Sequence, residues 1–284
     1  MQPSSIDLPP SPGQLFAAAF AEQGKAARID LPITITEAFP GFARRPRLAV
    51  RNLFKVVKTS EPSASYWFET HPARGTSAVH EEQLRSEAGF AFHAGTAQLS
   101  PITAWVQVPP PLLDDRAALA SFLDFRLLVR LGTAENQMLT LGRGGVLEAP
   151  GIRRLPPGPD PVASLLAACN HVELMGGSAD GIMMNTTDYY RYLAPRQDIL
   201  SGLATLGIRI ARTRMVSAGT IIIGDFFAGA TIFDSGRSTI AFGRPPDGTF
   251  ARDGIAVCAE IRTALAIHLP THFFVAALTE SAAS

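Results

Sequence analysis

The stretch of sequence that decides the fold is Gly254–Leu278, which reads GIAVCAEIRTALAIHLPTHFFVAAL. Apolar side chains occupy alternate positions from Ile255 to Leu269, and Glu260 and Arg262 fall on the other parity. Alternation with a period of two predicts a strand with one buried face, here longer than the usual five or six residues. Pro270 ends the run. The pattern predicts a long half-buried strand on whose other face Glu260 and Arg262 form an ion pair.

A long amphipathic helix is predicted upstream of this strand, over Asp115–Leu141. Asp114 or Asp115 can cap its start, and Gly142 can end it. At 1.5 Å per residue it would be roughly 40 Å long, which fits a spine across an elongated subunit. The apolar stripe on which the prediction rests consists of Leu119, Leu123, Leu127, Leu131, Ala134, Met138 and Leu141.

Two strand-like runs precede the helix, over Phe54–Thr70 and Phe90–Val108, with the polar segment His71–Gly89 between them. Each run alternates apolar and polar residues, so together they predict a two-stranded arm with a solvated tip. Such a hairpin is too thin to be stable alone. It needs a platform, either in its own chain or in a neighbouring copy.

The first part of the chain is predicted to be an arm. Met1–Pro12 is rich in proline and reads as flexible. A short helical pattern covers Leu15–Gln23, with Ser11 as candidate N-cap, Pro12 at the first helical position and Gly24 as the stop. The segment Ile29–Arg51 is predicted to be extended, because Ile29, Leu31, Ile33 and Ile35 alternate with other residues.

The sequence after the long helix predicts an α/β region. Gly142–Pro161 is rich in glycine and proline and reads as a loop. Helices are predicted over Val162–Met175 and Thr186–Leu193, and short strands over Gly181–Met184, Gly207–Arg212, Thr220–Ile223, Ala230–Gly236 and Ser238–Gly243.

The composition argues against a protein that coats nucleic acid by charge. Lys plus Arg (25) equals Asp plus Glu (25), charged residues make up 18%, and the mean hydropathy is positive. A nucleic-acid coat would carry a surplus of positive charge. Few charges on a soluble chain suggest that much of its surface is buried against copies of itself, although an alanine-rich composition is an alternative explanation.

The sequence also bears on location. Met1–Pro12 lacks the basic start and apolar core of a signal peptide, and no run reaches the roughly 18 apolar residues that span a bilayer. Cys169 and Cys258 lie in a predicted helix and strand, which is typical of free thiols in a reducing cytosol. These features predict a cytoplasmic protein without a membrane segment.

The order of these parts resembles the major capsid proteins of tailed phages of the Hong Kong 97 type and their bacterial relatives, the encapsulins. The resemblance covers roughly Gly13–Leu278 and implies an α+β fold of the Hong Kong 97 kind. Four segments in the right order carry it: Pro111–Leu141 with its exit Gly142–Val146, Gly181–Tyr190, Leu206–Ala211 with Ala218–Phe226, and Val257–Phe273.

The resemblance also implies a division of the chain. Residues 1–53 would form an N-terminal arm and residues 54–108 an extended loop, the two-stranded arm described above. Residues 109–160 and 237–284 would form a peripheral domain that contains the spine helix. Residues 161–236 would form an axial domain whose tips meet at symmetry axes.

The function implied is that of a self-assembling icosahedral shell. About a dozen residues precede the arm, whereas large phages often carry a scaffolding segment there, which favours an encapsulin nanocompartment enclosing a cargo protein. The alternatives are a phage or prophage capsid that packages DNA, found in a virion, and a soluble α/β enzyme. The expected partners are other copies of the chain and a cargo protein, with neither nucleic acid nor membrane.

Two segments are candidates for function within such a shell. Arg196, Gln197 and Asp198 lie where the family places the axial tip, so their side chains are predicted to line a pore; a plain surface loop is the alternative. Leu15, Phe16 and Phe20 are predicted to face the lumen and contact cargo, and the alternative is that they pack on the spine helix.

Enzymatic chemistry is not predicted. His268 and His272 have a spacing seen in metal sites, but Pro270 between them prevents a shared helix face. Ser178 is flanked by glycine and alanine without the context of a nucleophile elbow. No constellation of nucleophile, base and electrophile is apparent, so we expect no catalytic residue, no metal and no cofactor.

Overall fold

The structure is a computed structural model that describes residues 9–38, 50–69, 92–243 and 255–278. The predicted hairpin tip, His71–Gly89, and the first eight residues of the predicted arm lie outside this part of the chain. The protein divides into two compact units. Unit 1 comprises residues 1–45, 100–135 and 235–262, and unit 2 comprises residues 46–99, 136–234 and 263–284.

The predicted spine helix is confirmed as one helical run from Arg116 to Leu141. Asp115 caps it, since its Oδ1 accepts hydrogen bonds from two backbone N–H groups at 2.9 and 3.0 Å. The stripe needs correction at its end, because Leu141 is exposed and Leu139 is buried. A π turn widens the helix, so buried positions continue at a spacing of four. The run consists of α4 (Arg116–Phe122), η5 (Leu123–Leu127) and α5 (Leu128–Leu141).

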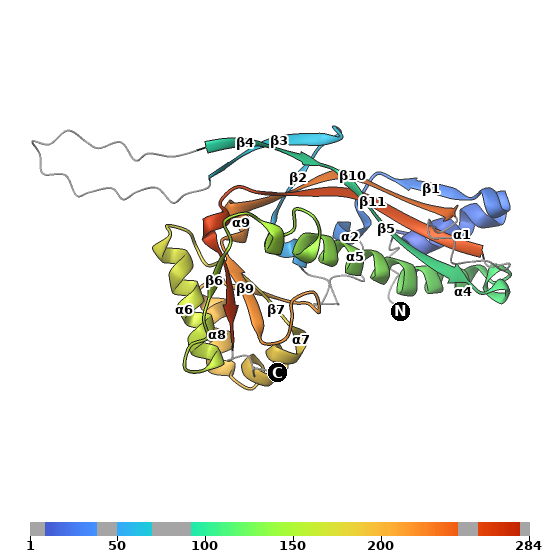
Figure 1. The fold of residues 1–284 in the computed structure, drawn as a ribbon. Coiled ribbons are helices and arrows are strands. Elements are labelled where there is room, and N and C mark those ends of the chain that lie inside the picture. The colour runs from blue at the N-terminus through green and yellow to red at the C-terminus, as the bar shows by residue number, and fades with distance from the viewer. Residues whose placement is uncertain (1–8, 39–49, 70–91, 244–254, 279–284) are drawn as a thin grey trace, which may run out of the picture. The chain divides into compact units, whose positions relative to one another are not determined.

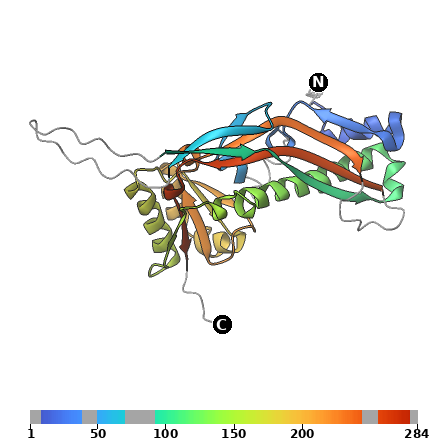
Figure 2. The same ribbon diagram turned by 45° about the horizontal axis from the view of Figure 1, so that its top comes forward.

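One sheet has the strand order β1-β10-β11-β5, and β2 also pairs with β10. Its two longest strands run side by side, as Figure 2 shows in orange and red. The two strands predicted over residues 230–243 are one strand, since Gly236 (φ 66°) accommodates the irregularity between them. The strands are β1 (Arg28–Leu31), β2 (Lys55–Lys58), β5 (Ser100–Val108), β10 (Ala230–Gly243) and β11 (Ile255–Ile267).

The long strand of the opening stretch is confirmed as β11. Arg262 donates from Nε to Glu260 Oε1 at 2.9 Å, as predicted. The alternation of burial stops at Thr263, beyond which both faces are buried, and Leu269 lies after the end of the strand. The chain then turns through η8 (Pro270–His272) into a separate strand, β12 (Phe273–Ala277).

The predicted hairpin is shorter than the two sequence runs. Only β3 (Ser63–Glu69) and β4 (Phe92–Gln98) form a two-stranded sheet, while β2 and β5 join the larger sheet. Proline has no backbone N–H, so Pro62 interrupts the first run. Its carbonyl oxygen accepts a hydrogen bond from the N–H of Leu99 (2.9 Å), where the second run divides.

The N-terminal helix is confirmed as α1 (Pro12–Gln23), with Pro12 at its first position and Gly24 after its end, as predicted. Ser11 and Gln14 form a reciprocal capping box at its start. The extended segment predicted over Ile29–Arg51 is confirmed over Ile29–Leu31 and is wrong over Ile35–Ala38, and residues 39–49 lie outside the described part of the chain. The chain turns after Leu31 because the Ser238 hydroxyl donates to the Ile33 carbonyl (2.8 Å) and accepts from the Ile35 N–H (2.9 Å), and α2 (Ile35–Ala38) follows.

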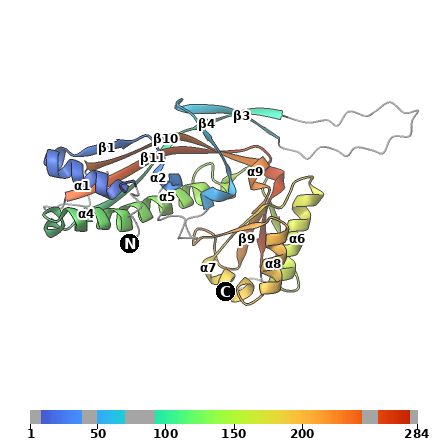
Figure 3. The same cartoon turned by 180° about the vertical axis from the view of Figure 1, so that it is seen from behind.

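Unit 2 contains a second sheet of order β6-β12-β9-β7-β8. Helices α6 and α8 lie on the same side of it (Figures 1 and 3) and bury Leu165 and Leu203 in one apolar core. The predicted strand Gly181–Met184 is confirmed residue for residue. The elements are β6 (Arg153–Leu155), α6 (Pro161–Leu174), β7 (Gly181–Met184), α7 (Thr186–Asp188), η7 (Tyr189–Leu193), α8 (Gln197–Thr205), β8 (Arg209–Arg212), β9 (Thr220–Gly224) and α9 (Phe226–Gly229).

Short 3-10 turns complete the described elements: η1 (Gly24–Ala26), η3 (Val50–Leu53), η4 (Pro110–Leu113) and η6 (Val146–Glu148). None of the helices among the described residues combines the length and the apolar character needed to cross a membrane.

Candidate assembly sites

The hairpin β3–β4 rests on its own unit through its inner face. Tyr66 and Ala97 belong to that face and pack with Ala264 and Ala266 of β11. The small alanine side chains allow the hairpin backbone to approach the strand closely. Because two strands alone bury little apolar surface, this contact gives the hairpin the platform that the sequence indicated it needs.

His268 fastens the base of the hairpin. Its Nδ1 lies 2.9 Å from the Trp67 carbonyl oxygen, and its Nε2 lies 2.9 Å from the Thr231 hydroxyl. A carbonyl oxygen only accepts, so Nδ1 carries the proton in the neutral ring. The N–H of Glu69 also donates to the His268 carbonyl oxygen at 2.8 Å. This histidine therefore has a structural role on the hairpin.

The outer face of the hairpin carries two large exposed aromatic rings. Trp67 is 65% exposed and Phe92 is 57% exposed. The strand register pairs Trp67 with Ala94 and Glu69 with Phe92, which places the two rings on one face two positions apart. An exposed aromatic pair on a thin hairpin is typical of a surface that another chain covers.

The N-terminal helix α1 packs within unit 1. The Phe16 ring lies 5.2 Å from the Phe242 ring and is fully buried, and the Phe20 ring lies 5.3 Å from Phe242. Of the three residues predicted to contact cargo, Leu15 is the exposed one. The Asp124 carboxylate accepts hydrogen bonds from the Ser11 hydroxyl and from the Gly13 N–H (2.8 Å).

The predicted pore segment carries an exposed ion pair at the start of α8. Arg196 donates to Asp198 through Nε (3.2 Å) and Nη2 (3.0 Å), which lowers the pKa of the Asp198 carboxyl. Gln197 donates from Nε2 to the Ala194 carbonyl oxygen at 3.1 Å. The three side chains are exposed, as either a pore or a surface loop requires.

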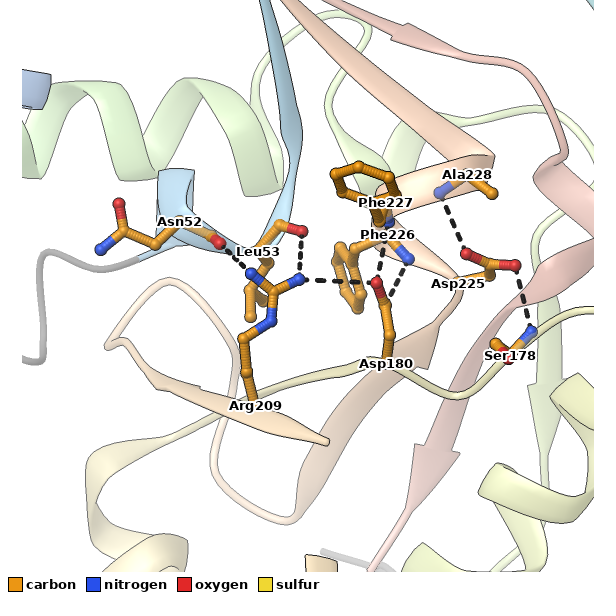
Figure 4. A network of polar contacts seen from close by, with 9 residues as sticks. All are labelled: Asn52, Leu53, Ser178, Asp180, Arg209, Asp225, Phe226, Phe227 and Ala228. Atoms are coloured by element: carbon orange, nitrogen blue, oxygen red, sulfur yellow. Dashed lines mark hydrogen bonds and ion pairs between the residues drawn. The ribbon is translucent and has the colours of Figure 1, made fainter. Parts of the chain in front are cut away.

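A polar network that the sequence did not reveal surrounds Asp180 in unit 2 (Figure 4). Its carboxylate accepts from the N–H groups of Phe226 (2.7 Å) and Phe227 (3.0 Å), and Arg209 lies 3.5 Å away. Burial raises the pKa of Asp180, and the two amide hydrogen bonds oppose that rise. Arg209 also donates to the Leu53 carbonyl oxygen (2.9 Å).

Asp225 extends this network to the loop that precedes β7. Its carboxylate accepts from the N–H groups of Ser178 and Ala228, both at 3.0 Å, and lies 4.0 Å from His272 Nδ1. Burial lowers the pKa of His272, and the nearby Asp225 and Glu69 oppose this effect. Ser178 thus contributes its backbone to the network.

The network borders a hollow of about 560 Å³. Backbone amides already occupy the oxygens of its two carboxylates, so the groups hold loops in place. Within the described ranges, no cluster of three His, Cys, Asp or Glu side chains could hold a metal. The hollow is lined by Gly176, Gly177, Ser178, Asp180, Gly207, Arg209, Asp225, Phe227 and Ala228.

A second feature missed in the sequence is a tyrosine–arginine cluster. The Arg212 guanidinium carbon lies 4.6 Å from the Tyr189 ring centre and 5.5 Å from that of Tyr190, and Nη1 donates to the Tyr190 hydroxyl at 2.9 Å. Three of the four tyrosines of the chain lie between residues 189 and 192. That concentration is the available signal, but the sequence pattern there predicts only a helix over Thr186–Leu193.

Comparison with known proteins now decides the family. The profile of the Phage capsid family matches residues 43–190, which is more than half of the chain. This chain belongs to the phage capsid family. Members of this family are structural shell proteins, which agrees with the prediction that the chain is not an enzyme.

Individual relatives agree with this membership. The major capsid protein of Enterobacteria phage HK97 is 25% identical over 244 residues, which cover 79% of this chain and 63% of that protein. The chain thus spans less than two thirds of that relative.

Solved structures show the Hong Kong 97 fold. A virus-like particle from Pyrococcus furiosus has a TM-score of 0.56 at 14% identity, covering 80% of this chain and 91% of that one. The capsid of an empty GTA particle gives 0.56 at 19%, covering 82% and 90%. Mycobacterium phage Cain gives 0.57 at 16%, covering 84% and 91%. The predicted α+β capsid fold is confirmed.

Proposed function

We propose that this phage capsid family member is the subunit of a self-assembling icosahedral shell that encloses a protein cargo, as an encapsulin nanocompartment does inside the cell. The observation that carries the proposal is the outer face of the hairpin β3–β4. There Trp67 and Phe92 are exposed on a two-stranded sheet whose inner face packs against β11. A neighbouring copy would cover these rings.

The free energy gained by burying the outer face of the hairpin is the size expected for a shell that assembles through many weak contacts. Fully burying a large apolar side chain contributes roughly 1.5–3 kcal/mol. Because Trp67 is 65% and Phe92 57% exposed, covering what remains of both would contribute about 2–4 kcal/mol per copy, before the cost of association. A contact of this size is weak alone, but the smallest icosahedral shell repeats it in roughly sixty copies.

The balance of charge favours a protein cargo over nucleic acid. Positive and negative side chains are equal in number, 25 of each, so the folded chain has no surplus with which to neutralise phosphates. A capsid that packages DNA is the second candidate. The relative from Enterobacteria phage HK97, which is named a major capsid protein, favours that reading.

The finer assignments follow from the shell. Residues 1–53 would serve as the arm, 54–108 as the extended loop, 109–160 and 237–284 as the peripheral domain, and 161–236 as the axial domain. Arg196, Gln197 and Asp198 would line a pore, where symmetry turns each charge into a ring. Leu15 and the accessible part of Phe20 would contact cargo, with Phe16 supporting them from the core.

Electron microscopy of the purified chain, with a nucleic-acid assay of the same particles, tests the proposal. Uniform closed shells without nuclease-protected nucleic acid are expected. Shells with protected DNA would favour the capsid reading, and a monodisperse monomer would overturn both. Trp67→Ser should lower the assembled fraction, whereas Trp105→Phe, a conservative change in a different strand, should not.

Ion flux tests the pore. Arg196→Ala and Asp198→Ala should each change the rate at which a charged small molecule enters closed shells, with opposite sign for anions and cations. Unchanged rates in both variants would show that the segment is a surface loop.

A further inference from the structure

Positive charge is concentrated in one stretch of unit 2. Residues 186–216 contain five arginines and two aspartates, although cations and anions are equal in number over the whole chain. Arg196 is paired with Asp198, and Arg209 is paired with Asp180. The other three arginines of the stretch have no carboxylate within ion-pair distance among the described residues. They are Arg191, Arg212 and Arg214.

The nearest acidic residue in the sequence does not neutralise these arginines. Asp188 is only 4% exposed, and its Oδ2 accepts a hydrogen bond from the Gly219 N–H at 2.7 Å. Arg191 and Arg214 are exposed, and Arg212 is partly buried. Exposed cations that lack a partner anion in their own chain are available to an anion from another molecule.

The three arginines lie at or beyond the carboxyl ends of β7 and β8. These strands are parallel, with Met184 opposite Arg212, so their carboxyl ends lie side by side. The loops that follow them are tied together, because the Thr213 N–H donates to the Met184 carbonyl (2.9 Å) and Asn185 Nδ2 donates to the Val216 carbonyl (2.8 Å). We call this region the basic edge and define it as Tyr190, Arg191, Arg212 and Arg214.

Arg212 is already oriented to bind an anion. Its guanidinium carbon lies 4.6 Å from the Tyr189 ring centre, and its Nη1 donates to the Tyr190 hydroxyl at 2.9 Å. Because the hydroxyl oxygen accepts that bond, its own proton remains available to donate. The Tyr190 hydroxyl and the other N–H groups of Arg212 can therefore donate together to one carboxylate. The ordered guanidinium loses little side-chain entropy when it does so.

We propose that the basic edge binds an acidic segment of a partner protein through its Asp and Glu carboxylates. Arginine and tyrosine are enriched among the residues that dominate binding energy at protein interfaces. Three unpaired cations match a short run of carboxylates, whereas proteins that hold nucleic acid by charge make roughly 6–10 phosphate contacts. Arg212 also covers the tyrosine rings on which a base would stack. The inference goes beyond the proposed shell and does not depend on it.

Fluorescence anisotropy of the full chain tests this binding. The probe is a short fluorescein-labelled peptide of alternating glutamate and alanine, and the control probe has glutamine in place of glutamate. The acidic probe should bind and the control probe should not, and added salt should weaken binding because it screens the charges. Absence of binding by the acidic probe at low ionic strength, or equal binding of the two probes, would overturn the proposal.

Substitutions locate the binding on the basic edge. Arg212→Gln should weaken binding of the acidic probe at least tenfold, and Arg214→Gln, at an exposed position, should weaken it several-fold. Tyr190→Phe keeps the ring but removes the hydroxyl that orients Arg212, so it should also weaken binding several-fold. Arg116→Gln is the matched control, since it removes an exposed arginine of α4 and should bind as the wild type does. Unchanged binding in Arg212→Gln and Arg214→Gln would contradict the proposal.

A nucleic-acid probe and thiol labelling separate the other occupants of this surface. Tighter binding of labelled oligothymidylate than of the acidic peptide would assign the basic edge to nucleic acid and overturn the proposal. In particles, Tyr190→Cys in a Cys258→Ser background should react with a maleimide dye, since Cys169 is buried and its thiol pKa is raised to about 11. Protection of the new thiol would show that another copy covers the edge and would likewise overturn the proposal.

Failure of this inference and failure of the shell have different signatures. A chain that forms no particles but binds the acidic peptide through Arg212 would lose the proposed function and keep the basic edge as a binding surface. A chain that forms particles without binding the peptide would lose only the inference drawn from the basic edge.

Discussion

The guanidinium of Arg51 is bonded to the carboxylate of Asp234 in the interior of unit 2, where the two side chains are only 3% and 0% exposed. Arg51 lies in the turn before β2, and Asp234 lies in β10. The same two strands pair in parallel, with Asp234 opposite Lys58. The ion pair therefore fixes where β2 begins along β10, close to the segment that leads into the hairpin.

Removing one member of this pair should destabilise the fold strongly. Arg51→Ala removes the guanidinium that is bonded to the buried Asp234 carboxylate, and breaking a buried ion pair from one side typically costs about 3–5 kcal/mol. Urea unfolding followed by tryptophan fluorescence measures the change. Arg28→Ala is the matched control, since its pair with Asp30 is exposed to solvent and should contribute little to stability. Equal losses in the two variants would contradict the structural role given to Arg51.

Two glycine-to-alanine substitutions should change the stability of the fold in opposite directions. A Cβ at Gly13 would lie 2.3 Å from the Ala120 carbonyl oxygen, so Gly13→Ala should push α1 away from α4. A Cβ at Gly202 meets nothing within 4 Å, so Gly202→Ala should stabilise α8 by roughly 0.5–1 kcal/mol. Thermal unfolding compares the variants. A neutral Gly13→Ala would mean that α1 does not need this close approach.

Loss of the His268 ring should loosen the hairpin and little else. His268→Ala removes the hydrogen bonds to the Trp67 carbonyl and the Thr231 hydroxyl. Amide hydrogen exchange should rise several-fold over β3 and β4 and stay unchanged over β7. Thr231→Val removes one partner of the ring and should give a smaller effect on the same amides. Equal exchange rates over β3 and β4 in the wild type and in His268→Ala would show that the packing on Ala264 and Ala266 is enough to hold the hairpin in place.

The sequence predicted most elements because their signals are local. Asp115 caps the spine helix, Ser11 caps α1, and β7 has the predicted bounds. One error came from a long-range contact. The turn at Ile35 depends on the hydroxyl of Ser238, which is 203 positions away in the chain. No local pattern near Ile35 could have shown it.

The candidate sites likewise fall into those that a local sequence pattern can predict and those that the fold assembles from distant segments. Exposed charges such as Arg196 and Asp198 can be read from a polar loop, and the structure places them on the surface. The hollow beside Asp180 could not be predicted, because its lining comes from three separate stretches around Gly176, Gly207 and Asp225. The fold brings these stretches together at the amino ends of β7 and β8.

Acid should weaken unit 2 through His272. Burial lowers the pKa of this ring below its usual 6.5, although the Asp225 and Glu69 carboxyls and the Met175 carbonyl oppose the shift. Gly177 packs so closely that a Cβ there would lie 2.7 Å from Nδ1, which explains the loss of water around the ring. The folded ring is therefore neutral over a range in which the unfolded ring is protonated.

The unfolded chain thus binds more protons than the folded chain just below pH 6.5. Stability should fall as the pH drops from 6.5 to the lower folded pKa, by at most about 1.4 kcal/mol per pH unit for one proton, and His272 adds no further loss below that point. Urea midpoints from pH 7.5 to 5.5 measure the slope. His272→Gln, which cannot titrate, should flatten it, while His93→Gln on the exposed hairpin strand should not. An equal slope in His272→Gln would assign the acid sensitivity to the neighbouring carboxyls.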